Sequence, residues 1–251
     1  TPEAASRMVA LYSRFVGGEI DVASCEEAEL TKTGENAFRD VSIAFANELA
    51  QICERVGADF LKVRALINKS PGRNVLLAGG GVGGHCIPKD PWLLAYGAPD
   101  LDPLLLRASR ARNEGMPMHV ADLVAAVLSD GKKSISGARI AVLGMSYLED
   151  SDDMRHTPSE ALVAELEARG ATVVPHDPYV HRFAGDLGTA VAGVDCIVLM
   201  VAHTEYKNLD WKQLGSLVAH RAVVDARFVV DGAQMAENNF SFRGVGRPRG
   251  H

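Results

Sequence analysis

The stretch 79–92 combines a thiol, a carboxylate and a run of glycines in the order Gly-Gly-Gly-Val-Gly-Gly-His-Cys-Ile-Pro-Lys-Asp-Pro-Trp. Glycine amides can approach an anion closely because no side chain stands in the way. Cys86, with Lys89 nearby, can ionise and act as a nucleophile, and Asp90 places a carboxylate four residues after it. The alternative is a flexible glycine turn with a bystander cysteine. The spacing favours covalent chemistry at Cys86.

The same stretch also satisfies a dinucleotide fingerprint, G-x-G-x-x-G, through Gly79, Gly81 and Gly84. That fingerprint binds a pyrophosphate where a helix opens directly after the glycines. Pro88 and Pro91 are expected to interrupt such a helix, because proline is poorly tolerated beyond the first turn. We therefore do not expect NAD to bind at this loop.

The bulk composition is that of a soluble protein. The 251 residues are 47% hydrophobic and 23% charged, with a formal net charge of −6. No apolar run approaches the roughly 18 residues that a membrane span needs, and no signal peptide is visible. A negative net charge argues against a general nucleic-acid binder. The sequence predicts a cytoplasmic protein with no membrane or nucleic-acid partner.

The four cysteines lie far apart and show no C-x-x-C spacing, which fits neither a zinc site nor a disulfide framework and suits a reducing compartment. They are Cys25, Cys53, Cys86 and Cys196. One alternative is a metal site centred on the cysteine stretch. Its donors would be His85, Cys86, Asp90, His176 and Asp177. Their spacing matches no zinc pattern, so no metal is expected.

A long helical pattern dominates the first part of the chain. Residues 1–16 predict a short helix, and a long helix begins at residue 25 and ends at Gly57, followed by a shorter one over 59–67. Lys32 and Asn36 are four residues apart and share a face of the long helix, although a solvated polar pair is the alternative. The apolar stripe of this helix exceeds what one small domain covers, which predicts a homodimer.

Further helices follow the cysteine stretch. The sequence predicts a helical turn over 91–96 and helices over 104–113 and 118–128. A polar linker over 129–137 then marks a domain boundary.

Strands alternate with helices beyond the linker. The apolar runs that predict strands are 139–143, 172–175, 195–201 and 222–224, and a capped helix is expected over 157–169. This order predicts a parallel sheet with helices on both faces and a ligand crevice at the carboxyl ends of the strands, where His176, Asp177 and His203 lie. Residues 241–251 are expected to form a loose tail.

Four stretches of the chain together resemble the nucleotide-sugar dehydrogenases, the UDP-glucose/GDP-mannose dehydrogenase family. They are 28–39, 81–86, 142–158 and 224–227. The second, continued by Asp90-Pro91-Trp92, is the most specific and resembles the branch that oxidises UDP-N-acetylmannosamine and related UDP-N-acetylhexosamines. The resemblance covers almost the whole chain and concerns the central and C-terminal parts of the family.

The resemblance implies an α/β protein in two main parts. A helical central dimerisation domain, residues 19–133, would carry the cysteine and precede a Rossmann-like parallel-sheet UDP-sugar-binding domain, residues 134–251. Residues 1–18 would be a remnant helix of an N-terminal NAD-binding domain that is absent here. A fragment of this kind is expected to be inactive on its own.

The reaction implied is an NAD-dependent oxidation of the sugar C6 alcohol to a carboxylate. The cysteine matching Cys86 would add to the C6 aldehyde to give a thiohemiacetal, which becomes a thioester and is then hydrolysed. Lys32 and Asn36 match residues that stabilise the oxygen becoming negative, and donors preset against an oxyanion contribute strongly to rate. Asp90 matches a carboxylate that takes part in proton transfer.

The resemblance also implies a set of binding residues. Those expected to contact the UDP-sugar are Arg39, Asn74, Gly81, Gly83, Gly84 and Arg227. Arg155 matches an arginine that approaches the NAD phosphates.

The chain departs from the family pattern at three further positions. Leu148 stands where many relatives have a lysine that contacts the substrate nucleotide, which puts nucleotide affinity or identity in question. Ala78 and Gly80 replace prolines common in the loop of this branch.

A non-catalytic nucleotide-sugar-binding or dimerisation module is the alternative function. The joint presence of Cys86, Lys32, Asn36 and Asp90 argues against it, since a scaffold needs none of them.

Overall fold

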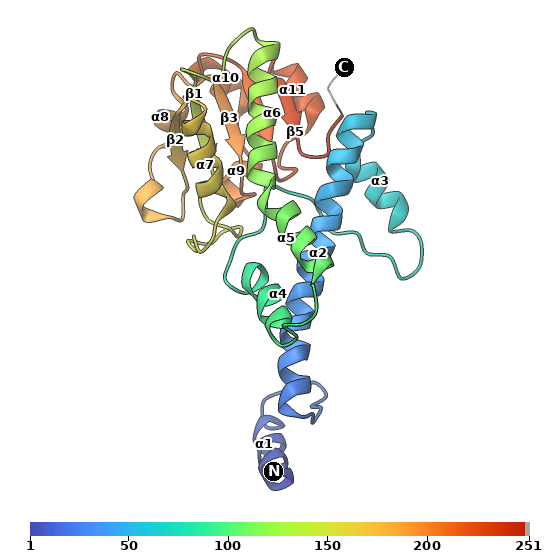
Figure 1. Ribbon diagram of the computed structural model, residues 1–251. Helices are drawn as coiled ribbons and strands as arrows, with labels where there is room; N and C mark the ends of the chain where they lie inside the picture. The colour runs from blue at the N-terminus through green and yellow to red at the C-terminus, as the bar shows by residue number, and fades with distance from the viewer. Residues whose placement is uncertain (249–251) are drawn as a thin grey trace.

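A computed structural model describes residues 1–248, in which one long helix leads from the N-terminal end of the molecule to an α/β layer (Figure 1). This helix, α2 (Cys25–Val56), begins with a capping box in which the Ser24 hydroxyl accepts from the Glu27 amide and the Glu27 carboxylate accepts from the Ser24 amide. It ends at Gly57, whose φ of 75° suits glycine. The predicted start and end of the long helix are confirmed.

Shorter helices surround α2. The first, α1 (Pro2–Tyr12), buries no residue and lies at the far end of the molecule, while α3 (Phe60–Ile67) follows α2 directly. Helices α4 (Cys86–Tyr96) and α5 (Leu104–Glu114) pack along α2. Helix α6 (Met116–Asp130) then leads to the sheet and packs against it.

The second half of the chain forms a parallel five-stranded sheet in the order β2-β1-β3-β4-β5. The strands are β1 (Arg139–Leu143), β2 (Thr172–His176), β3 (Cys196–Leu199), β4 (Ala222–Asp225) and β5 (Ser241–Gly244). The helices between them are α7 (Pro158–Ala168), the 3-10 turn η1 (His181–Phe183), α8 (Leu187–Val191), α9 (Thr204–Lys207), α10 (Trp211–Leu217) and α11 (Gly232–Glu237). The predicted parallel sheet is confirmed, with four strands at the expected places.

Alternate residues of each strand face opposite sides of the sheet, and helices cover both sides. Ile140 and Val142 of β1 belong to the core that contains α6 and α7, whereas Ala141 and Leu143 pack with α8, α10 and α11. The first of these cores also includes Ala46 of α2 and therefore extends into the helical part of the molecule.

One correction concerns the helix after the cysteine, which was expected to be broken and to leave only a turn over 91–96. Helix α4 instead opens at Cys86 and contains Pro91. Pro88 is tolerated because it lies in the first turn, where amide groups have no acceptor within the helix.

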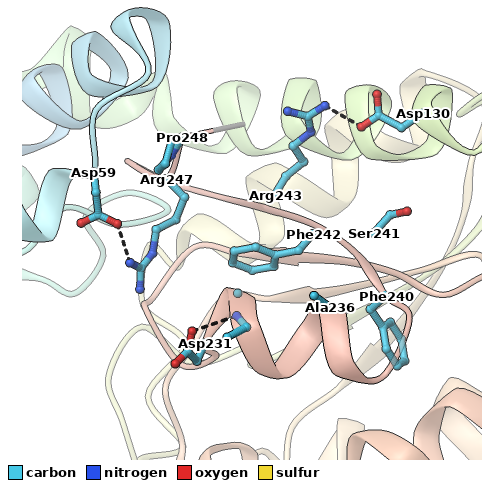
Figure 2. Close-up of a pocket in the computed structure, with 12 residues that line it drawn as sticks. Asp59, Asp130, Asp231, Ala236, Phe240, Ser241, Phe242, Arg243, Arg247 and Pro248 are labelled. Carbon is cyan, nitrogen blue, oxygen red and sulfur yellow. Dashed lines mark hydrogen bonds and ion pairs between the residues drawn. The ribbon is translucent and has the colours of Figure 1, made fainter. Parts of the chain in front are cut away.

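A second correction concerns the C-terminal residues, which were expected to form a loose tail over 241–251. Residues 241–244 form β5. Two arginines of this segment line a cavity of about 510 Å³, and each forms an ion pair with an aspartate of the same cavity (Figure 2). Arg243 contacts Asp130 at 2.5 Å, and Arg247 contacts Asp59 at 2.9 Å, so both anchor this segment to neighbouring helices. Residues 249–251 lie outside the described part of the chain.

Within residues 1–248, none of the helices combines the length and hydrophobicity required to cross a bilayer.

Gly144→Ala is expected to destabilise the fold by two additive effects. The φ of Gly144 is 97°, and a methyl group there would lie 2.5 Å from Cβ of Val201 at the start of the loop after β3. The left-handed backbone costs about 1–2 kcal/mol for a residue with a side chain, and the clash adds about 1–3 kcal/mol.

Gly193→Ala is the matched control, since its φ is 67° and no atom lies within 4 Å of the added methyl group. It should show only the backbone cost. Urea denaturation measures both variants, and equal losses of unfolding free energy would contradict the steric contribution at Gly144.

Candidate functional site

Cys86 is the first residue of α4 and is exposed. The amides of a helical first turn carry positive partial charge, which favours an anion at this position. His85 at the N-cap makes no side-chain capping bond. The thiol is therefore accessible and stands where negative charge is stabilised.

Asp90 lies one turn further along α4 and is buried, with only 5% of its surface exposed. Asn36 of α2 donates from Nδ2 to its Oδ2 at 2.6 Å, and Lys89 Nζ lies 3.1 Å from its Oδ1. Burial alone would raise the pKa of Asp90, but the bonds from Asn36 and Lys89 outweigh it and lower the pKa. The structure thus joins Asn36 and Asp90 directly and keeps the carboxylate ionised.

Two cations lie within electrostatic reach of the thiol. The pKa of Lys32 is raised chiefly by its hydrogen bond with Glu35, at 3.1 Å, with smaller contributions from Cys86 and Asp90. The pKa of Arg155 is raised chiefly by Asp153, with a smaller contribution from Cys86. In return Arg155 lowers the pKa of Asp153 to about 2.

The glycine loop packs against the α/β layer. A methyl group on Gly81 would lie 2.9 Å from the Pro158 side chain, and one on Gly83 would lie 2.5 Å from Cβ of Tyr147. The amide of Gly84 donates to the Arg155 carbonyl at 2.8 Å. The glycines therefore permit a close approach between two backbone segments, while their expected contact with a sugar stays a prediction.

These contacts also bear on NAD. A helix does follow the loop, so the proline argument against a dinucleotide was wrong in its physical basis. The Gly79 amide, however, donates to Asn47 and the Gly84 amide to Arg155, and the residues before the loop form no strand. Two of the loop's amides are therefore unavailable to a pyrophosphate, and the strand that the fingerprint requires before the glycines is not formed.

The other expected substrate-binding residues are dispersed. Arg227 is half-buried, and its Nε donates to the Met200 carbonyl at 2.8 Å while Nη2 lies 3.5 Å from the Gly81 carbonyl. Arg39 and Asn74 are exposed, and within residues 1–248 neither side chain hydrogen-bonds to another residue of the site. The structure brings Arg227 to the glycine loop but does not join Arg39 or Asn74 to Cys86.

A buried polar network beneath the loop was missed in the sequence. Arg110 Nη1 donates to Asp40 Oδ1 at 2.7 Å, and Asn113 Nδ2 donates to the same oxygen at 2.8 Å. Asn47 then links Asn113, at 2.9 Å, to the Gly79 amide. A signal was available, because Asn36, Asp40 and Asn47 recur at helical spacing on one face of α2.

Asp40 carries the main energetic cost of this network. It is fully buried, burial raises its pKa despite the nearby Arg110, and its Oδ2 has no hydrogen-bond partner among residues 1–248. Its ionised form therefore depends on Arg110.

The two histidines expected at the strand ends are both buried: His176 is the last residue of β2, and His203 is the N-cap residue of α9 after β3. His203 Nδ1 accepts from the Asp150 amide at 2.9 Å, so the ring proton is on Nε2, which donates to Asp177 at 3.0 Å. Burial alone would raise the pKa of Asp177, but the His203 bond and the amides of Met145 and Ser146 lower it strongly. No group of three or more metal-ligating side chains occurs within residues 1–248.

Comparison with known proteins identifies the family to which this chain belongs. The central-domain model of the UDP-glucose/GDP-mannose dehydrogenase family matches residues 26–115, and the family's UDP-binding domain model matches residues 141–232. The chain therefore belongs to the UDP-glucose/GDP-mannose dehydrogenase family, as its motifs indicated.

Individual relatives agree with this assignment. The chain is 37% identical over 245 residues to the UDP-N-acetyl-D-mannosamine dehydrogenase of Pyrococcus horikoshii, an alignment that covers 98% of this chain and 58% of that protein. The solved structure of UDP-D-ManNAc dehydrogenase from the same organism superposes with a TM-score of 0.89 at 36% identity, again covering 98% and 58%. The NDP-N-acetyl-D-galactosaminuronic acid dehydrogenase of Methanosarcina mazei gives 0.90 at 34% identity, covering 96% and 55%. The chain spans a little over half the length of these relatives.

Cys86 is expected to react with iodoacetamide about tenfold faster than Cys25. Each is exposed and is the first residue of a helix, so the helix dipole favours both equally. Cys25 is followed by Glu26 and Glu27, whereas Lys32 and Arg155 lie within electrostatic reach of Cys86. Peptide mapping by mass spectrometry after timed alkylation measures both rates, and equal rates would contradict an activated thiol at Cys86.

Arg110→Ala should lower the free energy of unfolding by about 3–5 kcal/mol, because it leaves a buried carboxylate without its charge partner. Arg107→Ala is the matched control, since Arg107 forms an exposed ion pair with Asp102 at 3.0 Å. Loss of such an exposed pair costs at most about 1 kcal/mol. Denaturant titration of both variants decides, and a similar small loss for both would show that Asp40 does not depend on Arg110.

Proposed function

We propose that this chain supplies the reactive thiol and the nucleotide-sugar site of a UDP-sugar 6-dehydrogenase that uses NAD. The observation that carries the proposal is the position of Cys86 at the start of α4, beside the Asn36–Asp90 pair and against the β1–α7 loop. The names of the relatives support a UDP-N-acetylhexosamine as substrate, with UDP-N-acetylmannosamine the first to test.

The proposed chemistry of the thiol is the one that the family resemblance implies, and the surroundings of Cys86 support it. The Cys86 sulfur would add to the C6 aldehyde of the sugar, and the aldehyde oxygen would become the negatively charged oxygen of a thiohemiacetal. Lys32 and Asn36 are the donors proposed to stabilise that oxygen. Loss of hydride would give a thioester on Cys86, and water would release the carboxylate and restore the thiol.

Asp90 is proposed to accept a proton during hydrolysis. Its lowered pKa keeps it ionised at neutral pH, and its hydrogen bond from Asn36, one of the proposed oxyanion donors, supports this role. A carboxylate within reach of the attacking water acts as a general base.

NAD would serve as the hydride acceptor twice, first when the C6 alcohol is oxidised to the aldehyde and again when the thiohemiacetal becomes the thioester, so two NAD molecules would be reduced. Residues 1–248 offer it no cradle at the glycine loop, and the parallel sheet is the region that the family's UDP-binding domain model matches. The exposed guanidinium of Arg155, held by Asp153, is proposed to meet the NAD phosphates.

A homodimer is proposed through α2. Phe38, Phe45 and Ile52 recur every seven residues, and each is between 49% and 75% exposed. A stripe of this size and spacing is typical of a helix that packs against a partner.

The same proposal divides the chain into three parts, residues 1–18, 19–133 and 134–251. It also places the protein in the cytoplasm.

Calorimetric titration tests the nucleotide-sugar site. UDP-N-acetylmannosamine is expected to bind this chain in the micromolar range, while GDP-mannose and NAD are not. Cys86→Ser should bind the UDP-sugar equally well, because the thiol contributes to the reaction and not to the nucleotide contacts. Absence of UDP-sugar binding would contradict the proposal.

Turnover provides a second test. NAD and the UDP-sugar added to this chain alone are expected to give no NADH, because residues 1–248 lack a dinucleotide cradle at the thiol. Formation of NADH, followed by its absorbance, would overturn that reading of the glycine loop.

A further inference from the structure

The β1–α7 loop, residues 144–157, packs closely against the glycine loop at Gly83 and Gly84. The hypothetical methyl group on Gly84 would lie 3.0 Å from two ring carbons of Tyr147, and φ of Gly84 is 89°. The Gly83 backbone packs on Cβ of the same tyrosine. Gly84 is two residues before Cys86, so the Tyr147 ring packs against the segment that leads into α4.

The same loop also fixes the cysteine segment by hydrogen bonding. The Gly84 amide donates to the Arg155 carbonyl at 2.8 Å, and the Tyr147 amide donates to the Asp153 carbonyl at 3.0 Å. Asp153 in turn binds the Arg155 guanidinium through Nη2 at 2.6 Å. Tyr147 and Arg155, near the two ends of the β1–α7 loop, therefore both contact the glycines, and Asp153 connects them to each other.

The loop follows the carboxyl end of β1, which is where a parallel sheet receives its ligand. Leu148, directly after Tyr147, is exposed at this edge. A ligand bound against residues 145–150 would change the position or the mobility of the Tyr147 side chain. Because close-packed protein interiors transmit strain, a displacement of the Tyr147 ring would also act on the glycines packed against it.

We propose that Tyr147 is a positioning residue for Cys86, so that a nucleotide bound at the β1–α7 loop alters the reactivity of the thiol. The proposal rests on the proposed function, because it requires a nucleotide at this edge. It assigns to Tyr147 a role beyond holding ligand, since its ring contacts the cysteine segment directly.

The test uses UDP, which lacks the sugar and cannot cover the thiol. In a Cys25→Ser background, where Cys86 is the exposed cysteine of residues 1–248, the alkylation rate is measured across pH with and without saturating UDP. We expect UDP to change the rate by about fivefold, which lies at the low end of typical coupling between sites. Tyr147→Phe should keep this response, because the ring fills the space under Gly84, and Tyr147→Ala should lose it.

Phe183→Ala is the matched control. Phe183 is a half-buried aromatic residue of the same domain that packs against the core and not on the glycine loop. This variant should respond to UDP as the parent does. Should Tyr147→Ala fail to bind UDP by calorimetry, Tyr147→Leu replaces it, since it also removes the ring that packs under Gly84 but keeps more of the side-chain volume, and it should abolish the response while UDP still binds.

The outcomes separate the two proposals. If UDP does not bind the parent chain, the nucleotide site and the inference both fail. If UDP binds but leaves the alkylation rate and its pH profile unchanged, the proposed function stands and the role of Tyr147 is overturned. A UDP response retained in the alanine variant, or in Tyr147→Leu where that replaces it, overturns the role as well.

Discussion

The buried charge of Asp40 is the constraint on which the arrangement of the thiol site depends. A carboxylate inside a helical bundle is stable only with a charged partner and further hydrogen bonds, and here Arg110 and Asn113 of α5 supply them. Asn47 extends the network to the amide that begins the glycine loop. The depth of α2 against α5 and the path of the loop are therefore fixed by one set of polar contacts.

The charges around Cys86 follow from where the two halves of the molecule meet. Lys32 comes from α2, Asp90 from α4 and Arg155 from the β1–α7 loop. Each has its own carboxylate or amide partner: Glu35 pairs with Lys32, Asn36 with Asp90, and Asp153 with Arg155. The Asn36–Asp90 bond is part-buried and fixes the carboxylate in place, which would reduce the reorganisation that the proposed reaction requires, whereas Lys32 and Arg155 remain exposed beside their partners.

Local signals in the sequence were sufficient for much of the fold. The run Arg-Ile-Ala-Val-Leu at 139–143 predicts β1 because a strand buried on both faces is apolar throughout. The four-residue spacing of Lys32 and Asn36 placed both on one face of α2, and the motif around Cys86 indicated Asp90 as a neighbour. These features depend on residues close together in the chain.

The features that were missed depend on distant residues. Strand β5 is short and carries Ser241 and Arg243, so its sequence resembles a tail until β4 offers it an edge to pair with. Asp40 resembles a residue of a solvated face until α5 covers it. Helix α4 opens where the two prolines were expected to interrupt it: the restriction on proline weakens in the first turn, where Pro88 lies, and the helix also continues through Pro91.

Helix α6 has a consequence for how the molecule comes apart. Its Met116 end packs near Gln51 of α2, and its Asp130 end pairs with Arg243 of β5. The core along its length includes residues of α2, α6, α7 and the sheet in one continuous cluster. The helical part and the sheet therefore share an interior, so neither can melt without exposing the other, and heat would unfold them in a single cooperative step.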